Sequence, residues 1–375
     1  MNILHLTHTD ARYDNRILKE LGALVDIDSY NVTCIGFASN EGASRSKNEL
    51  NAKLIILNSI TIPSWVPWPI GPAIMLIGFY IRLSKAAIKI RPAVVHCHDT
   101  MVLPVGVLIK MITKAKLIYD AHELESNKNG QIKKWSKATL FVEKRCWRKI
   151  DLLISVSDSI IGWYEKTLGV KFNSLILNSP LISKVDSVPH KYFHQLYGIP
   201  ANKLVFVYLG ILGNGRGIDY IIEAFSNENI ESHVVFIGYG ELSNKIKEIS
   251  IKRTNIHLHD SVPHEEVVSL VKNADVGLCL IENVSLSDYY CLPNKLFEYT
   301  FAGLPVLASD FPDISALVKK YNLGMVCAIN SKSINEAVAD IELKPLEPIT
   351  SDLTALGWQK QAEKLRKAYD KILIQ

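Results

Sequence analysis

Short apolar runs rich in Val, Ile and Leu alternate with segments of helical period along the whole chain. Continuously apolar strands, rather than strands of alternating polarity, are typical of parallel sheets that helices cover on both faces. In the first half the pattern predicts strands at residues 3–6, 32–35, 54–57, 94–97, 117–119, 152–156 and 175–177. In the second half it predicts strands at residues 204–209, 234–237, 256–258, 276–280, 306–308 and 325–327. The sequence therefore predicts an α/β protein built from two doubly wound parallel sheets.

A polar segment that contains three prolines, residues 179–200, separates the two series of strands. At 375 residues the chain exceeds what one hydrophobic core usually supports. We therefore expect two domains, residues 1–185 and 186–355, with the boundary inside this polar segment. Residues 356–375 carry apolar positions at helical spacing, and we expect a helix there that crosses back to pack on the first domain.

The overall composition is that of an ordinary globular protein, with 48% hydrophobic and 21% charged residues. A formal net charge of +4 is too small to indicate a nucleic-acid partner. The six cysteines lie far apart, mostly in apolar runs and without paired spacing, which indicates reduced thiols. The first seven residues read as a buried strand rather than a signal peptide, so we expect a cytoplasmic protein.

The most informative segment is residues 292–309. Pro293 and Asn294 stand at a predicted helix start, Glu298 lies about one turn inside, and Gly303 marks the stop. Such a helix start can bind a phosphate while an acid binds sugar hydroxyls. Glu298 could instead be a solvated surface acid, but its neighbours are apolar, and a carboxylate in that setting needs partners such as a ribose. The segment therefore predicts a sugar-nucleotide site.

Two glycine-rich turns, residues 210–217 and 238–242, directly follow predicted strands of the second half. Ligands of open parallel sheets bind beyond the carboxyl ends of the strands. Glycines allow the backbone to approach a phosphate closely, and Arg216 is a permanent cation that could offset a diphosphate. Each turn could equally be only a turn. The glycine spacing differs from the dinucleotide fingerprint, so a nicotinamide dehydrogenase is not expected.

Taken together, these motifs resemble the GT-B fold glycosyltransferases of the retaining group called family 4. The matching segments are residues 14–20, 95–99 and 119–124 in the first half, and residues 210–217, 262–276 and 293–309 in the second half. The resemblance covers essentially the whole chain. It implies two Rossmann-like domains that face each other across a cleft, with a nucleotide-sugar on the C-terminal domain and the acceptor on the N-terminal one.

The resemblance also implies roles for particular residues. Glu298 would bind the ribose, Arg216 and Lys295 would neutralise the diphosphate, and His122 would touch the donor sugar. The other donor-binding positions would be Gly210, Gly213, Gly240, Val262, Pro293, Asn294 and Leu296. The acceptor side of the cleft would include Arg12, Asn15 and His98. Without the resemblance, His122 would be interpreted as a helix-capping or core histidine.

Two positions depart from the family pattern. Tyr290 stands where a second glutamate is common, and Ile211 stands where an arginine is common. Lys295 would replace the lost positive charge. Two alternatives to a transferase stay open: a sugar-nucleotide epimerase of the same architecture, and a catalytically silent partner subunit that binds the nucleotide-sugar.

The resemblance implies a hexosyltransferase-like reaction (EC 2.4) that retains anomeric configuration. Negative charge grows on the leaving phosphate, and Arg216, Lys295 and a helix dipole can stabilise it without a metal or cofactor. A metal-dependent transferase would need an Asp-x-Asp pair at the end of a strand. The one such pair in the sequence, Asp26 and Asp28, instead precedes a strand of the first half. The sequence shows no carboxylate pair for glycoside hydrolysis.

Two segments of the first half suggest an anionic membrane surface. A helical projection of residues 132–150 places Ile132, Trp135, Thr139, Val142, Cys146 and Ile150 on one stripe. Lysines and arginines lie opposite, with Phe141 pointing outward among them. The segment between Lys53 and Arg82 has no charge, includes Trp65 and Trp68, and could alternatively form a core helix. We therefore expect peripheral membrane attachment and a lipid-linked saccharide acceptor, in cell-surface polysaccharide synthesis.

Overall fold

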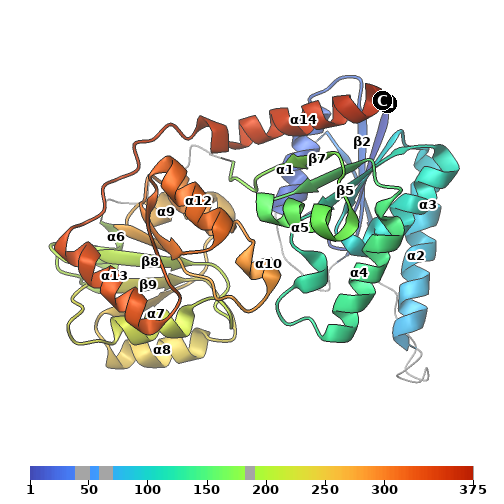
Figure 1. Cartoon of the computed structure of the whole chain (residues 1–375). Helices are drawn as coiled ribbons and strands as arrows, with labels where there is room; N and C mark the ends of the chain where they lie inside the picture. Colours follow the sequence, from blue (N-terminus) through green and yellow to red (C-terminus); the bar gives the residue numbers. More distant parts are fainter. Residues whose placement is uncertain (39–50, 59–70, 182–190, 375) are drawn as a thin grey trace. The chain divides into compact units, whose positions relative to one another are not determined.

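The chain divides into two compact units in a computed structural model that describes residues 1–38, 51–58, 71–181 and 191–374 (Figure 1). The first unit comprises Met1–Leu177 and Gln359–Gln375, and the second comprises Asn178–Trp358. The predicted boundary near residue 185 lies outside the described residues. Each unit is built around one parallel sheet.

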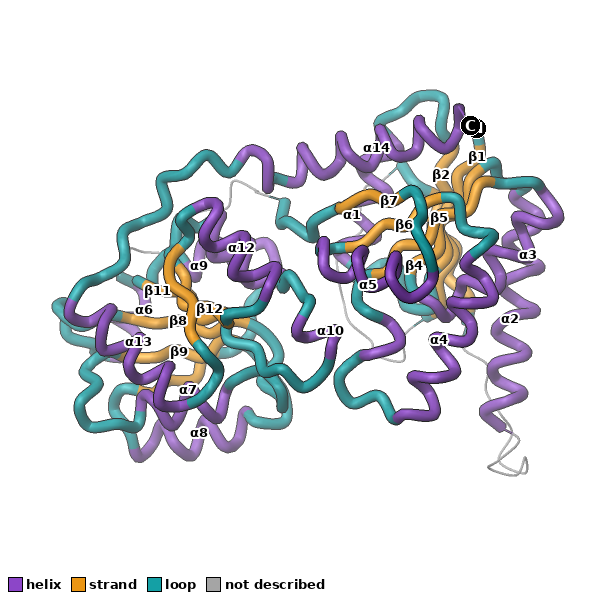
Figure 2. Tube along the Cα trace, in the orientation of Figure 1, coloured by secondary structure: helices purple, strands orange, loops and turns teal. Residues whose placement is uncertain are grey.

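The first unit contains a seven-stranded parallel sheet in the order β3-β2-β1-β4-β5-β6-β7. Strands are orange in Figure 2. Its strands are β1 (Asn2–Leu6), β2 (Asn31–Phe37), β3 (Lys53–Leu57), β4 (Val94–His98), β5 (Lys116–Ala121), β6 (Leu152–Ser155) and β7 (Asn173–Leu175). The predicted strand at residues 175–177 is displaced, because ladder pairing with β6 starts at Asn173. The strand order reverses between β1 and β4, which creates a topological switch point.

Helices cover both faces of this sheet. They are α1 (Asn15–Val25), α2 (Gly71–Ile90), α3 (Leu103–Thr113), α4 (Lys133–Trp147), α5 (Asp158–Leu168) and α14 (Trp358–Ile374), with short 3₁₀ turns at Thr100–Val102 and Glu125–Asn127. Asp14 caps α1 by accepting from the backbone N–H groups of Arg16 and Ile17. The terminal helix α14 packs beside α1, because the Arg366 guanidinium donates to the Ala23 carbonyl (2.6 Å).

The second unit contains a six-stranded parallel sheet in the order β10-β9-β8-β11-β12-β13. Its strands are β8 (Val205–Leu209), β9 (His233–Ile237), β10 (Ile256–His259), β11 (Val276–Cys279), β12 (Val306–Ser309) and β13 (Gly324–Cys327). Its helices are α6 (Tyr192–Tyr197), α7 (Ile218–Phe225), α8 (Ser243–Lys252), α9 (His264–Val271), α10 (Leu286–Tyr289), α11 (Asn294–Phe301), α12 (Pro312–Tyr321) and α13 (Ser331–Leu343), with a 3₁₀ turn at Thr354–Leu356. The order reverses between β8 and β11.

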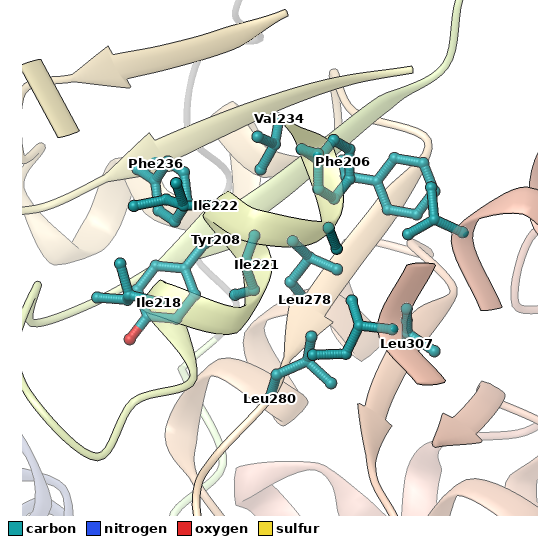
Figure 3. Close-up of a cluster of buried hydrophobic side chains, with 14 of the residues drawn as sticks. Phe206, Tyr208, Ile218, Ile221, Ile222, Val234, Phe236, Leu278, Leu280 and Leu307 are labelled. Atoms are coloured by element: carbon teal, nitrogen blue, oxygen red, sulfur yellow. The ribbon is translucent and has the colours of Figure 1, made fainter. Parts of the chain in front are cut away.

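The core of the second unit lies between its sheet and the helices α7 and α13 (Figure 3). Phe206 and Tyr208 of β8 pack with Ile218 and Ile221 of α7, and all four side chains are fully or almost fully buried. Burial of such side chains is the main stabilising contribution, worth about 1.5–3 kcal/mol each. This core holds the ends of β8 and β11 at fixed positions, so the loops that follow them have a rigid base.

Candidate functional site

Two glycine turns of the second unit pack on each other at the carboxyl ends of β8 and β9. The backbone N–H of Gly210 donates to the Ile237 carbonyl (3.0 Å). Gly238 and Gly240 have φ of +145° and +154°, and a Cβ at either would collide with a carbonyl of the facing turn. Only glycine fits these two positions, since backbone lies directly against backbone. Gly213 lies in the turn that begins at Gly210, close to Glu241 of the other turn.

Helix α11 begins directly beside the first of these turns. Pro293 is its N-cap residue and makes no side-chain cap, while Asn294 is exposed. The first-turn N–H of Leu296 donates to the Pro293 carbonyl (3.1 Å). The start of the helix therefore presents the positive end of its dipole at the edge of the sheet where the loop of Gly210 lies.

The side chain of Lys295 is the most distinctive feature of this edge. Its ammonium lies 3.6 Å from the ring centroid of Tyr208 and next to Gly210. The nitrogen is buried and has no hydrogen-bond partner among the residues that the structure describes. Burying an ammonium without an anion or acceptor is unfavourable, and a cation–π contact offsets only part of that cost. The geometry therefore suits an anionic ligand between Lys295 and the glycine turn.

Glu298 lies one turn further along α11 and is only 6% exposed. Its Oε1 is 3.5 Å from Nδ1 of His264, the first residue of α9. The alternative that Glu298 is a solvated surface acid is therefore wrong. Val262, also predicted to bind the donor, is half-buried in the loop before α9. His264 was not among the predicted site residues, although it lies two residues after Val262.

Arg216 faces a carboxylate, Asp288, that the sequence did not predict. Its guanidinium is 3.7 Å from Oδ1 of Asp288, whose other oxygen accepts from the Ser285 hydroxyl (2.6 Å). Arg216 is thus held by a weak ion pair and stays partly exposed. Of the two departures from the family pattern, Ile211 is exposed and Tyr290 is half-buried.

Tyr299 fixes α11 to the sheet. Its hydroxyl accepts from the Leu209 backbone N–H (2.8 Å) and donates to the Val207 carbonyl (3.1 Å). Its ring packs on Gly277 of β11, where any Cβ would collide with it. Tyr299 therefore sets the positions of Lys295 and Glu298 relative to the end of β8. A glycine inside a predicted strand is the sequence signal of such a close approach.

A cavity of about 440 Å³ opens at the ends of β11, β12 and β13. It is lined by Tyr220, Glu282, Asn283, Val284, Tyr289, Asp310, Phe311, Cys327, Ala328 and Ile329. Neither Lys295 nor Glu298 lines it. The cavity and the Lys295 edge are thus two separate features of the second unit.

In the first unit, His122 follows β5 and lies between two carboxylates. Its Nε2 is 3.1 Å from both Asp120 Oδ2 and His98 Nδ1, and its Nδ1 is 3.8 Å from Asp99 Oδ1. Burial acts to lower the pKa of His122, but the charges of Asp120 and Asp99 outweigh it and raise the pKa to about 10. His122 is therefore a partly exposed imidazolium at neutral pH.

Strand register explains why so many polar side chains gather near His122. His5 of β1 pairs with His96 of β4, and His98 pairs with Asp120 of β5, so all four point to one face of the sheet. All four are fully buried. His96 and His98 are two residues apart, as are Asp120 and His122, so polar residues at this spacing near the ends of β4 and β5 are the sequence signal of the cluster.

Helix α1 packs on this face of the sheet. Its Arg16 forms a buried ion pair with Asp120. Arg16 donates to both oxygens of Asp120 (3.1 and 2.9 Å) and lies 3.2 Å from Glu20. Burial raises the pKa of Asp120, but Arg16 and His122 overcome it and hold the pKa well below its usual range. Burial and the charge of Asp120 raise the pKa of Glu20 to about 8.

Two groups in this cluster come close enough to hold a metal ion. Their ligand atoms lie within 4.8 Å of one another, and the groups are His5, Glu20, His96 and His98, and His98, Asp120 and His122. Arg16 already places a cation against both carboxylates, and the three buried imidazoles are hydrogen-bonded to one another or to Tyr369. The guanidinium of Arg16 therefore already supplies one positive charge to this cluster.

The residues predicted for the acceptor side lie in different environments. Arg12 is half-exposed and pairs with Asp10 through two hydrogen bonds (2.9 and 2.6 Å). Asn15 is the exposed first residue of α1. His98 is fully buried, so it reaches His122 and not the surface.

The projected apolar stripe of residues 132–150 is wrong in its first half. Ile132 and Trp135 are 58% and 65% exposed, and the buried face of α4 is centred on Glu143, Cys146 and Trp147. Glu143 points inward because the hydroxyls of Tyr119 and Tyr164 donate to it (2.8 and 2.6 Å), a polar anchor that a hydrophobic projection does not detect. As predicted, Phe141 points outward.

Helix α2 is not a core helix over its first half. Only Gly71, Leu83 and Ala87 of this helix are buried. Its exposed apolar side chains are Ile74, Met75, Leu76, Ile77 and Ile81. Trp65 and Trp68 lie outside the described residues. None of the described helices combines the length and the apolar character needed to cross a bilayer.

Comparison with known proteins identifies the class of this chain. Its fold matches sucrose-phosphate synthase from Thermosynechococcus elongatus (TM-score 0.80, 14% identity, 100% of this chain and 99% of that one). It also matches Anabaena HepE in complex with UDP-glucose (TM-score 0.73, 14% identity, 99% of this chain and 100% of that one). At such identities the likeness shows the fold alone, which is the GT-B fold.

Sequence comparison gives the family. Glycosyl transferases group 1 match residues 191–368, and Glycosyltransferase Family 4 matches residues 18–176. An uncharacterized glycosyltransferase of Methanocaldococcus jannaschii is 23% identical over 244 residues, which are 60% of this chain and 60% of that protein. The chain belongs to the group 1, family 4 glycosyltransferases.

Proposed function

We propose that this glycosyltransferase takes a sugar from a nucleoside-diphosphate sugar held by the second unit, and passes it to a saccharide acceptor. The observation that carries the proposal is the buried ammonium of Lys295 between the Gly210 turn and the start of α11, which has no hydrogen-bond partner among the described residues. A diphosphate would supply the missing anion. Anabaena HepE, which shares the fold, has been solved with UDP-glucose, and this supports the same class of donor.

The proposed binding mode uses three groups of one edge. The α11 dipole and the ammonium of Lys295 meet the diphosphate, and Arg216 adds a second cation after releasing or sharing Asp288. Glu298, poised near His264, accepts from the ribose hydroxyls. Gly210, Gly213 and Gly240 shape the turns that border the phosphates.

Departure of the nucleoside diphosphate is the costly step, because negative charge grows on the leaving phosphate. Preorganised cations and dipoles stabilise that charge, and removing a single such group usually costs roughly 10²–10³ in rate. We infer a reaction with retention of configuration that requires neither a metal nor a cofactor. His122, an imidazolium at neutral pH, would contact the donor sugar or the developing charge.

A panel of nucleotide-sugars tests this proposal. The full-length protein is incubated with UDP-, GDP- and ADP-sugars in the presence of chelator. Nucleotide-sugars of one base should protect the protein against thermal unfolding and should be slowly hydrolysed. Protection without turnover, with any acceptor, would favour the silent-subunit alternative. An isomerised nucleotide-sugar formed without acceptor would favour the epimerase alternative. No protection by any member would contradict the donor site.

We further propose that the acceptor is lipid-linked and that the first unit binds an anionic membrane, as expected in cell-surface polysaccharide synthesis. Helices α2, α3 and α4 lie side by side on one face of the sheet (Figure 1). Their exposed apolar side chains include Ile77 and Ile81 of α2, Met111 and Ile112 of α3, and Trp135 and Phe141 of α4. Exposed apolar and aromatic side chains on helices that also carry cations are typical of peripheral membrane binding.

The charge of α4 supports the same surface. Lys133, Lys134, Lys137, Lys144 and Arg145 are all exposed on this helix. Arg145 lies over the ring of Phe141 (5.1 Å), so cation and aromatic ring share one patch. Each lysine or arginine near an anionic bilayer contributes about 1 kcal/mol of attraction.

A further inference from the structure

A continuous chain of buried hydrogen-bonding groups leads from His122 to the terminal helix α14. His122 Nε2 is 3.1 Å from His98 Nδ1, and His98 Nε2 is 2.9 Å from His5 Nδ1. His5 Nε2 is 3.2 Å from the Tyr369 hydroxyl, which is 2.7 Å from His96 Nδ1. Four of the five side chains are fully buried, and only His122 is partly exposed.

Asp120 sets the direction of this chain at its exposed end. The carboxylate lies 3.1 Å from Nε2 of His122, so that nitrogen carries a hydrogen. His98 Nδ1 lies 3.1 Å from this nitrogen and further, 3.6 Å, from Asp120 Oδ2, so it accepts from the N–H of His122. Burial lowers the pKa of His98 and of His5, so each imidazole is neutral and has one N–H. The N–H of His98 is therefore on Nε2, donating to Nδ1 of His5.

The buried end of the chain requires the same direction. With Nδ1 accepting, the N–H of His5 lies on Nε2 and donates to the Tyr369 hydroxyl. That hydroxyl then donates to Nδ1 of His96, which leaves the N–H of His96 on Nε2. This nitrogen lies 3.6 Å from a carboxylate oxygen of Asp120 and 3.6 Å from a carboxyl oxygen of Glu20, and the charge of Asp120 makes a hydrogen there favourable. Asp120 thus enforces one orientation from both ends.

We propose that Tyr369 is a positioning residue for His122: through His5 it keeps the hydrogen of His98 on Nε2, so that Nδ1 of His98 accepts from the N–H of His122. Tyr369 is the one member that both accepts from His5 and donates to His96, so it joins the two halves of the chain. Without the Tyr369 hydroxyl, the hydrogen of His5 can lie on Nδ1 instead of Nε2. His98 then carries its hydrogen on Nδ1, where it points against the N–H of His122.

The charged and titratable groups around His122 come from every element packed against it. They are Asp120, His96 and His98 on the strands, Asp99 and His8 in the loops, and Arg16 and Glu20 on α1. Loss of the Tyr369 hydroxyl changes none of these charges. A change in the titration of His122 would therefore report the hydrogen-bonded chain and not a new charge.

Nitrogen-15 NMR of the full chain, labelled in histidine, tests this inference. In the wild type, His5, His96 and His98 should each be neutral with the hydrogen on Nε2. In Tyr369→Phe, the Nδ1–H form of His98 should become populated, and the pKa of His122 should fall by roughly half a unit or more. His5→Leu, a second break in the same chain, should lower the pKa of His122 in the same direction.

Tyr164→Phe is the matched control, because it removes a buried hydroxyl that bonds to Glu143 and belongs to a separate network. It should leave the four histidines unchanged. An Nδ1–H form of His5 or His98 in the wild type would overturn the proposal. So would an unchanged titration of His122 in folded Tyr369→Phe and His5→Leu, with folding checked by circular dichroism.

Addition of Zn²⁺ to the same samples distinguishes the hydrogen-bonded chain of side chains from a metal site. Unchanged signals of His5, His96 and His98 are expected. A joint shift of all three at stoichiometric Zn²⁺ would replace the hydrogen-bonded chain by a metal centre. The contact of His122 with the donor sugar rests on the proposed function. The spectra require neither a donor nor sugar transfer, so the hydrogen-bonded chain and the proposed function can be contradicted independently.

Discussion

At the residue scale, Glu298 shows what a sequence motif can and cannot specify. Its apolar neighbours predicted that it needs a partner, and it is indeed buried. Its proximity to His264 could not be predicted, because α9 and α11 are brought together only by the fold. The same holds for Arg216 and Asp288, which are far apart in the sequence.

Glu298→Gln should abolish most transfer while the fold stays intact. The amide has one acceptor oxygen and no charge, so the ribose loses a charge-assisted hydrogen bond worth about 1.5–3 kcal/mol. Affinity for the nucleotide, measured by calorimetry, should fall roughly 10- to 100-fold. Glu266→Gln, at an exposed position of α9, is the control and should bind normally. Full affinity in Glu298→Gln would refute the ribose assignment.

His122 should make stability depend on pH in a defined direction. Its pKa is raised to about 10 in the folded chain, mainly by Asp120 and Asp99 against the effect of burial. A raised pKa stabilises the fold fully below the unfolded value of about 6.5, and the stabilisation is lost as pH rises toward 10. The difference in unfolding free energy between wild type and His122→Gln should therefore shrink from pH 6.5 to pH 9.5.

Denaturant titrations at pH 6.5, 8 and 9.5 would measure this difference. Taking the difference between the two proteins removes most of the contributions of other groups, including Glu20, whose pKa is raised to about 8. A difference that stays constant, or grows with pH, would show that His122 is not held as an imidazolium.

At the element scale, strand positions could be predicted because each strand is a continuous apolar run. The displacement of β7 shows the limit, since pairing with β6 and not hydrophobicity decides where a short edge strand begins. The orientation of α4 could not be predicted, because buried tyrosine hydroxyls select Glu143 for its inner face. Polar anchors of this kind leave no trace in a hydrophobic projection.

Gly277→Ala should destabilise the second unit and disturb the start of α11. The new methyl group collides with the ring of Tyr299, which is fixed by hydrogen bonds to β8. Such overpacking costs about 1–3 kcal/mol, measurable as a lower denaturant midpoint. Gly162→Ala, in α5 with nothing within 4 Å of the new carbon, should instead stabilise by up to about 1 kcal/mol. Equal stability of both variants would refute the packing argument.

At the scale of the whole molecule, length and the proline-rich segment predicted two units, and each has the strand order of a doubly wound sheet. The sequence also predicted a terminal helix, and α14 packs on α1 of the first unit. The buried network that this helix completes through Tyr369 could not be foreseen, because its members come from opposite ends of the chain.

Membrane attachment is a prediction about the first unit as a whole. Trp135→Ser combined with Phe141→Ser should reduce flotation with anionic vesicles by roughly tenfold or more, because two exposed aromatic side chains no longer enter the bilayer surface. Ile251→Ser, at an exposed apolar position of α8 in the second unit, is the control and should float like the wild type. If the wild type does not float with anionic lipid, the membrane proposal is wrong.

The central claim is that the second unit holds a diphosphate against Lys295 without a divalent ion. Calorimetric titration of the nucleoside diphosphate selected by the donor panel, in the presence of chelator, tests it most directly. Wild type and Lys245→Met, whose lysine pairs with Asp219 on the surface, should bind equally, and Lys295→Met should bind at least about tenfold more weakly. Equal affinity in Lys295→Met, or binding that appears only when a divalent ion is restored, would contradict the account.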